Sequence, residues 1–155
     1  MADEGTETLA RDFLKALQAR HVEQILALFS DDGTWIAPEG TFTGKASIGA
    51  YLDWQFNRGQ DFKITECENG VVVEGNRAFI EHTIAFTLQG GRAEYVALSA
   101  LELKNGRVKR IRTVYDRLSL ERQIARGPLS RWAVDRLVRQ EENGLYGPKQ
   151  PHPHR

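Results

Sequence analysis

The sequence predicts an α+β domain in which a curved antiparallel sheet forms a cone around N-terminal helices, with a helical extension at the C-terminus. Two observations carry this prediction. Apolar residues recur at three- and four-residue intervals as far as Phe56, whereas the chain after Gly59 reads as extended segments cut by glycine-containing turns. Long strands coil strongly, and so few helices can cover only one face, so the sheet is expected to enclose a conical pocket.

The N-terminal part is predicted to hold three helices and a short strand. The apolar positions between residues 7 and 29 indicate two helices joined near 19–21. Turn-forming residues follow, and the β-prone segment 34–37 is stopped by Pro38. After a further turn, the helical interval returns and predicts a third helix from about 45 to 56.

The second half is predicted to form strands joined by tight turns. The extended segments are 62–68, 70–74, 78–88, 93–103 and 108–116. Asn105-Gly106 is a strong hairpin signal because both residues tolerate positive φ, so the strands are expected to form an antiparallel meander.

Two helices are expected after the last strand. The first covers about 118–125, and the second begins near Leu129, after the break at Gly127-Pro128, and ends before Gly144. Residues 144–155 are polar and proline-rich, which is typical of a disordered tail. The predicted folded domain therefore spans residues 1–143.

Composition restricts the class of protein. The chain has 155 residues, 41% of them hydrophobic, which is enough to bury a core without disulfides or metal. The single cysteine, Cys67, has no partner for a bridge and favours a reducing compartment. No apolar run reaches the ~20 residues of a membrane span, and the acidic N-terminus is unlike a signal peptide, so a cytoplasmic protein without a membrane partner is expected.

Several function classes are disfavoured. Residues 117–155 hold eight Lys or Arg against four Asp or Glu, but the interspersed acids dilute any basic footprint, so no nucleic-acid partner is expected. The sequence has no glycine-rich phosphate loop, no nucleophile elbow and no Cys/His pair with zinc spacing. We therefore expect no metal site and no cofactor.

Five local strings, in this order, carry a family resemblance: FLKAL at 13–17, LALFSDD at 26–32, FTGKASI at 42–48, NGRV at 105–108 and VYDRL at 114–118. With the order of elements, they resemble the cone-shaped superfamily that contains nuclear transport factor two, ketosteroid isomerase, limonene epoxide hydrolase and the SnoaL-type polyketide cyclases. The resemblance implies this fold and a small-molecule enzyme, and because the scaffold hosts many reactions it implies no single one.

The catalytic positions of two of these enzymes differ in this chain. Where ketosteroid isomerases place a phenolic donor, a general-base aspartate and a second acid, the matching positions are Phe13, Ala37 and Ser99. Where limonene-type epoxide hydrolases place an Arg and an Asp on the middle strand, the matching positions are Thr83 and Ala85. Both mechanisms are therefore disfavoured.

The last hydrolase carboxylate is retained as Asp116, and SnoaL-type cyclases also use an aspartate at this strand-to-helix boundary as general acid/base. Alternation places Arg112, Val114 and Asp116 on one strand face. If that face lines the cone, burial raises the pKa of Asp116 and Arg112 lowers it, leaving a carboxylate that moves a proton or activates water. The alternative is that Asp116 only caps the following helix.

Glu81 and His82 are neighbours on a predicted strand, so only one of them faces the pocket. The hydrolase pattern puts Glu81 and Thr83 inward, with Glu81 paired with Arg112 as a second catalytic group. The apolar residues beside His82 favour the opposite face. Both faces are therefore expected to be covered, one by helices and the other by a second subunit of a homodimer, with His82 either in the interface or acting as a base.

Aromatic side chains are expected to shape a hydrophobic ligand site. Tyr51 and Trp54 could also donate hydrogen bonds to a ligand carbonyl, although core packing explains most of these rings. Trp132 is expected to dock the C-terminal helix onto the domain or onto a neighbouring subunit. The predicted substrate-binding residues are Phe13, Trp35, Tyr51, Trp54, Thr83, Ser99 and Val114.

The sequence thus predicts a cofactor-independent isomerase or cyclase that transfers a proton on a hydrophobic carbonyl compound, with Asp116, Arg112 and Glu81 as the catalytic residues. The alternatives are water addition to an epoxide and a non-catalytic ligand-binding or dimerisation module.

Overall fold

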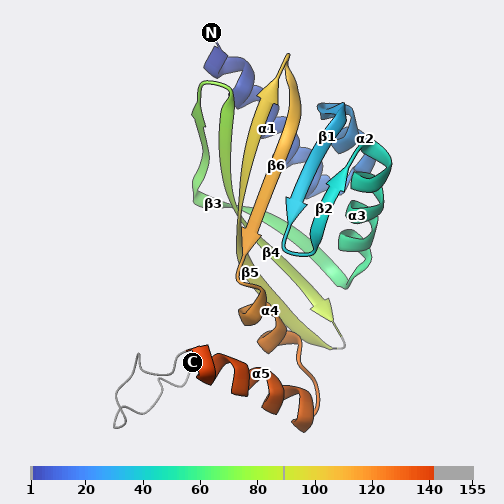
Figure 1. The fold of residues 1–155 in the computed structure, drawn as a ribbon, viewed down its shortest axis with the longest axis vertical. Helices are drawn as coiled ribbons and strands as arrows, with labels where there is room; N and C mark the ends of the chain where they lie inside the picture. Colours follow the sequence, from blue (N-terminus) through green and yellow to red (C-terminus); the bar gives the residue numbers. More distant parts are fainter. Residues whose placement is uncertain (1, 89, 142–155) are drawn as a thin grey trace.

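A computed structural model describes residues 2–88 and 90–141 (Figure 1). The predicted disordered tail, 144–155, and the domain boundary at 143 lie outside the described residues. The helices are α1 (Ala2–Ala19), α2 (Val22–Leu28), α3 (Lys45–Asn57), α4 (Arg117–Ile124) and α5 (Pro128–Glu141). The strands are β1 (Phe29–Ala37), β2 (Gly40–Thr43), β3 (Gln60–Glu74), β4 (Arg77–Leu88), β5 (Gly91–Lys104) and β6 (Arg107–Tyr115).

The strands form one sheet in the order β2-β1-β6-β5-β4-β3. The meander from β3 to β6 is antiparallel, as predicted. The expectation of a wholly antiparallel sheet is wrong at β1, which pairs in parallel with β6 and brings Trp35 opposite Ile111. This long-range pairing joins the first and last strands of the chain, so β1 and β2 lie beside β6 at one side of the sheet (Figure 1).

Two strand predictions need correction. The segments 62–68 and 70–74 form the single strand β3, whose pairing with β4 shifts register between Glu66 and Val71. The predicted turn at 38–40 connects β1 to β2, a strand that was not predicted. The two strands form a hairpin in which Trp35 pairs with Phe42. Both errors arise because a four-residue strand and an irregular strand leave weak periodicity.

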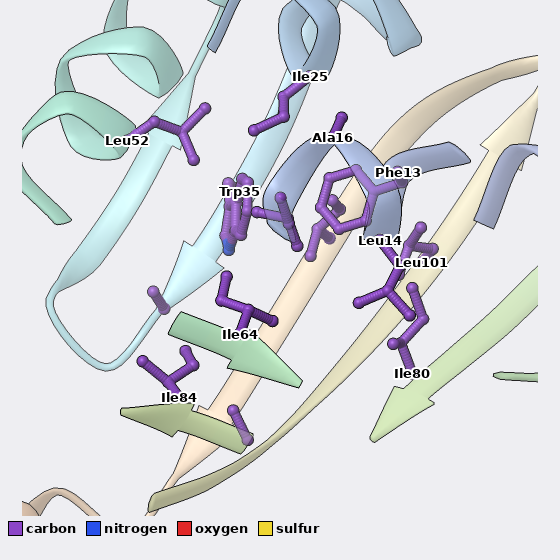
Figure 2. Packing of buried hydrophobic residues seen from close by; sticks show 14 of the residues in the cluster. Phe13, Leu14, Ala16, Ile25, Trp35, Leu52, Ile64, Ile80, Ile84 and Leu101 are labelled. Atoms are coloured by element: carbon purple, nitrogen blue, oxygen red, sulfur yellow. The ribbon is translucent and has the colours of Figure 1, made fainter. Parts of the chain in front are cut away.

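The helices cover the inner face of the sheet. Helix α1 packs against β3 and β4, and α3 packs against β1 and β2. Phe13 of α1, Ile25 of α2 and Leu52 of α3 are completely buried and meet the inward side chains of the strands (Figure 2). Burial of each such side chain stabilises the fold by roughly 1.5–3 kcal/mol. The aromatic rings of Phe13 and Trp35 lie 5.6 Å apart, so the middle of the predicted conical pocket is filled by core side chains.

Helices α4 and α5 extend beyond the end of β6 (Figure 1). Helix α4 packs against β5, and α5 packs against α4. Trp132 is 57% exposed, so it does not dock α5 onto the domain as expected. No helix within the described part of the chain is long and apolar enough to cross a membrane.

Candidate functional site

The inward face of β6 is the opposite of the predicted one. Ile111 and Thr113 are buried, whereas Arg112 is exposed and Val114 is 50% exposed. Glu102 of β5 pairs with Arg110, but the next residue, Leu103, pairs with Val108. One extra residue is therefore accommodated in β6, and such a bulge reverses the alternation beyond it. The prediction that Arg112, Val114 and Asp116 line the cone is wrong for this reason.

Asp116 lies at the surface and caps a helix. Its Oδ1 accepts a hydrogen bond from the backbone N–H of Ser119 at 2.9 Å, at the start of α4. The side chain is exposed, so the burial on which its predicted catalytic role depended is missing. The alternative role as an N-cap is the one that the contacts support.

The residues of β4 that face inward are the ones that its apolar pattern predicts, and not the ones that the epoxide hydrolase pattern predicts. His82 is only 2% exposed and faces inward, whereas Glu81 and Thr83 are half-buried on the other face. Glu81 accepts a hydrogen bond from Asn69 Nδ2 at 2.6 Å and forms no ion pair with Arg112 in the described chain. The predicted Glu81–Arg112 pair is thus wrong, and Thr83 is not in the interior, where it was expected.

His82 is an interior residue and not part of an outward interface. Burial lowers the pKa of its imidazole. Its Nδ1 has no hydrogen-bond partner among the described residues.

Four of the predicted substrate-binding residues do point into the domain: Phe13, Trp35, Tyr51 and Ser99. Trp35 Nε1 donates to Thr113 Oγ1 at 3.1 Å, and the hydroxyls of Thr113 and Ser99 lie 2.8 Å apart. These bonds satisfy buried polar groups, so Trp35 and Ser99 hold β1, β5 and β6 together. Phe13 belongs to the packed core.

A carboxylate that the sequence analysis did not single out, Glu39, organises the polar end of the interior. Its Oε2 accepts a hydrogen bond from the Tyr51 hydroxyl at 3.4 Å, and its Oε1 accepts one from the Tyr115 hydroxyl. Glu39 follows β1, Tyr51 lies in α3 and Tyr115 ends β6, so three elements meet here. The available signal was alternation, because Trp35, Ala37 and Glu39 share one face if the extended chain continues past Pro38.

The two phenols are held in their protonated form. Burial, followed by the charge of Glu39, raises the pKa of Tyr51 above its ordinary value. Burial and the hydrogen bond to Glu39 raise the pKa of Tyr115 to about 12. Both hydroxyls are therefore hydrogen-bond donors at neutral pH.

A hollow of about 380 Å³ opens beside Glu39. Phe42 and Tyr51 stack with ring centroids 4.3 Å apart, and Trp54, which is 48% exposed, stacks on Tyr51 at 6.1 Å. The residues lining the hollow are Glu39, Phe42, Ser47, Ala50, Tyr51 and Trp54. Its walls suit a flat apolar ligand, with one carboxylate at the edge.

This arrangement has the parts needed for proton transfer. A carboxylate within reach of a bound ligand is a general base, and a phenol that donates to it can donate instead to a developing oxyanion. Of the predicted binding residues, Tyr51 and Trp54 lie at this hollow, whereas the three predicted catalytic residues, Asp116, Arg112 and Glu81, do not line it.

The family model for the SnoaL-like domain matches residues 10–111. The chain belongs to the SnoaL-like family. The match covers Glu39 and Tyr51 and ends before Tyr115 and the helices α4 and α5. No curated protein matches the chain.

Solved structures share the fold. They include a protein of Catenulispora acidiphila with a ketosteroid isomerase-like fold in complex with trimethylamine, at 17% identity over 75% of this chain and 91% of that one, with a TM-score of 0.66. TerC co-crystallised with polyporic acid is 20% identical over 77% of this chain and 98% of that one, with a TM-score of 0.69. An LEH-like epoxide hydrolase of M. tuberculosis is 18% identical over 87% and 99%, with a TM-score of 0.66. These likenesses confirm the predicted cone-shaped superfamily fold.

Proposed function

We propose that the protein is a cofactor-independent enzyme that transfers a proton on a hydrophobic carbonyl compound, with Glu39 as the general acid/base. The observation that carries this proposal is the carboxylate of Glu39, which accepts hydrogen bonds from Tyr51 and Tyr115 at an aromatic hollow. Membership of the SnoaL-like family is consistent with it. Asp116, the residue expected from the sequence, is replaced in this role because it lies in solvent.

In the proposed step, Glu39 takes a proton from the carbon next to the ligand carbonyl. The negative charge then develops on the carbonyl oxygen, where a phenol that previously bonded Glu39 can donate to it. In an isomerisation, the proton returns from Glu39 to another carbon of the ligand. In a cyclisation, the enolate carbon instead attacks a second carbonyl carbon of the same molecule, the C=O π bond opens, and the resulting alkoxide takes the proton from Glu39; neither step changes the overall oxidation state. Trp54 and Phe42 hold the flat body of the ligand beside the carboxylate.

The test is hydrogen–deuterium exchange at carbons next to the carbonyl in a panel of apolar cyclic ketones, followed by NMR in D₂O. General acid/base catalysis contributes roughly 10²–10⁴-fold, so Glu39→Gln should lower the exchange rate by about that factor. Asp116→Asn is the matched control and should retain the rate. Equal exchange by the wild type and Glu39→Gln would contradict the proposal, and loss only in Asp116→Asn would restore the role predicted from the sequence.

Epoxide hydrolysis is the second candidate, favoured by the structural likeness to the M. tuberculosis enzyme. In that case Glu39 would activate water and the same variant would lose diol formation from a cyclic epoxide. Because the likeness is one of fold, proton transfer is the first choice. If neither reaction occurs in the wild type, the hollow belongs to a binding module.

We also propose a homodimer formed through the outer face of the sheet. Five apolar side chains on that face are 39–55% exposed: Val72, Phe79, Val96, Leu98 and Val114. Leu98 lies between Glu81 and Val114 in the strand register, which makes the exposed apolar positions neighbours across strands. Sedimentation velocity should give a dimer for the wild type and a monomer for Leu98→Glu, and a wild-type monomer would refute the proposal.

We propose a cytoplasmic location from the one cysteine. Cys67 is half-buried, with its Sγ 3.3 Å from Thr83 Oγ1, which supports a free structural thiol of the kind that a reducing compartment maintains. Fractionation of expressing cells, with the protein recovered from the cytoplasm, is the check.

A further inference from the structure

Arg58 lies immediately after α3, beside the site, and is half-buried. Its guanidinium carbon is 5.0 Å from the ring centroid of Trp54 and 5.1 Å from that of Phe86. Aromatic faces hold a guanidinium in this way while leaving its N–H groups free for hydrogen bonds in the plane. The side chain is therefore fixed in position by rings and not by an acid.

Within the described residues, Arg58 has no carboxylate within ion-pair distance, whereas many surface arginines of this chain have one. The positive charge of Arg58 acts on two phenols, because it opposes the rise in the pKa of Tyr115 and of Tyr95 that burial causes. Tyr115 in turn donates to Glu39. Arg58, which has no acidic partner among the described residues, and the carboxylate of Glu39 therefore both act on the phenol of Tyr115.

We propose that Arg58 is the anion-binding residue of the site and that the substrate is a planar aromatic compound with an ionised acidic group. The inference rests on the proposed function, since it places this anion beside Glu39. The acidic group of the ligand binds the guanidinium, and its ring system stacks along Trp54 into the hollow that Phe42 and Tyr51 line.

The chemistry of the site favours this assignment. Arginine presents paired N–H donors that match a carboxylate or an ionised enol, and these charge-assisted bonds are stronger than neutral ones. Tyr95 and Tyr115 stay protonated, because burial raises the pKa of each, so neither adds negative charge. The O–H of Tyr115 is donated to Glu39, which leaves the phenol of Tyr95 as a neutral donor. Glu39 repels the ligand anion, which keeps the acidic group at Arg58 and leaves the uncharged carbon next to the carbonyl toward Glu39.

The experiment is calorimetric titration of the full chain with naphthoate and with naphthamide, which have the same ring and differ in charge. The wild type should bind naphthoate at least about 10-fold more tightly than naphthamide, since a hydrogen bond to a charged group is worth ~1.5–3 kcal/mol. Arg58→Gln should weaken naphthoate binding by about 10–100-fold and naphthamide binding by less than about 3-fold. Arg77→Gln removes an exposed arginine at the start of β4 and should change neither affinity.

Three results would overturn the inference: no binding of naphthoate, equal affinity for both probes, or equal loss in Arg58→Gln and Arg77→Gln. Arg58→Lys keeps the charge and guards against misfolding of Arg58→Gln; it should retain part of the preference for naphthoate, and an unchanged preference would contradict a role for the guanidinium fork. Glu39→Gln separates this inference from the proposed function. It should lower the exchange rate by roughly 10²–10⁴-fold yet bind naphthoate at least as tightly as the wild type, because a repulsive charge is removed. If Glu39→Gln keeps its exchange activity, the proposed function fails while the naphthoate titrations still decide the role of Arg58.

Discussion

Glu39 and Asp116 are two carboxylates near the end of β6 that differ in their surroundings and in their hydrogen-bond partners. Glu39 receives hydrogen bonds from the hydroxyls of Tyr51 and Tyr115, which come from α3 and β6, at the edge of an aromatic hollow. Asp116 directly follows Tyr115 along the chain, yet it accepts its bond from the first turn of α4 in solvent. Tyr115 and Asp116 are neighbours in the chain, yet the first contacts Glu39 inside the domain and the second lies in solvent. The surroundings of a carboxylate, and not its place in a motif, therefore decide its chemistry.

The same contrast holds along the two faces of β6. Ile111 is completely buried and Thr113 is 7% exposed, whereas Val114 is 50% exposed. Residues on the inner face of β6 are therefore expected to stabilise the fold, and residues on the outer face are expected to contribute to dimer formation.

The largest effect should come from a cavity on the inner face. Ile111→Ala should lower the free energy of unfolding by about 2–5 kcal/mol, because the lost side chain leaves a void in a packed core. Val114→Ala on the outer face should cost less than about 0.5 kcal/mol at a protein concentration low enough to avoid association. Urea denaturation measures both, and similar losses would mean that the inner and outer faces are not as distinct as the burial indicates.

The next effect should come from the buried hydroxyls. Thr113→Val removes the acceptor of Trp35 Nε1 and the partner of Ser99, which leaves buried polar groups unsatisfied at a cost of roughly 1–3 kcal/mol. The matched change on the outer face, Thr83→Val, should cost less than about 1 kcal/mol because Thr83 is only half-buried. Thermal unfolding of both variants is the measurement, and a larger shift for Thr83→Val would reverse the comparison.

A pH-dependent effect should follow from His82. Burial lowers its pKa below the ordinary value of 6.5, so the unfolded chain binds this proton more readily than the folded one. Stability should therefore fall as the pH drops below about 6.5, by up to ~1.4 kcal/mol per pH unit, and level off below the pKa of the folded state. His82→Leu should flatten this part of the curve in urea titrations between about pH 7.5 and 5.5, relative to wild type.

The exposed His21→Gln is the control for that experiment and should leave the slope of the wild type in place. If His82→Leu keeps the wild-type slope, other groups cause the acid sensitivity.

The smallest effect should come from the outer carboxylate. Asp116→Ala removes the N-cap of α4 and should cost about 1 kcal/mol, whereas Asp116→Asn keeps a capping oxygen and should cost little. Neither change should alter exchange activity. A loss of activity without a loss of stability in Asp116→Ala would show that Asp116 does more than cap the helix.

Much of the fold could be predicted from the spacing of apolar residues and from turn-forming residues. The break between α1 and α2 falls at Arg20, which has a φ of 57°, and the predicted turn at Asn105-Gly106 has positive φ at both residues. The helices of the N-terminal half and the meander from β3 to β6 are confirmed because their signals are contained in short windows. Strand β2 and the parallel pairing of β1 with β6 were missed, since neither leaves a local signature.

The candidate site was only partly readable. Tyr51 and Trp54 were selected because aromatic side chains bury much apolar area and often form the walls of ligand sites, and both residues line the hollow. Glu39 was not selected as a site residue because Pro38 and Gly40 indicate a turn, and a turn by itself does not indicate a functional side chain. The direction of Arg112 and Val114 was misjudged, since the bulge at Lys109 reverses the alternation and no residue type there indicates a bulge.

The sequence by itself determined the order of the helices and of the strands of the meander, the buried face of α1 and the superfamily, because helix periodicity, turn residues and short motifs act over a few positions. Only the tertiary structure decided which way β6 faces and which carboxylate meets the phenols. Those outcomes depend on the register of β6 against β5 and on its pairing with β1, two contacts between segments far apart in the chain, and a one-residue change in register turns every side chain beyond it to the other face.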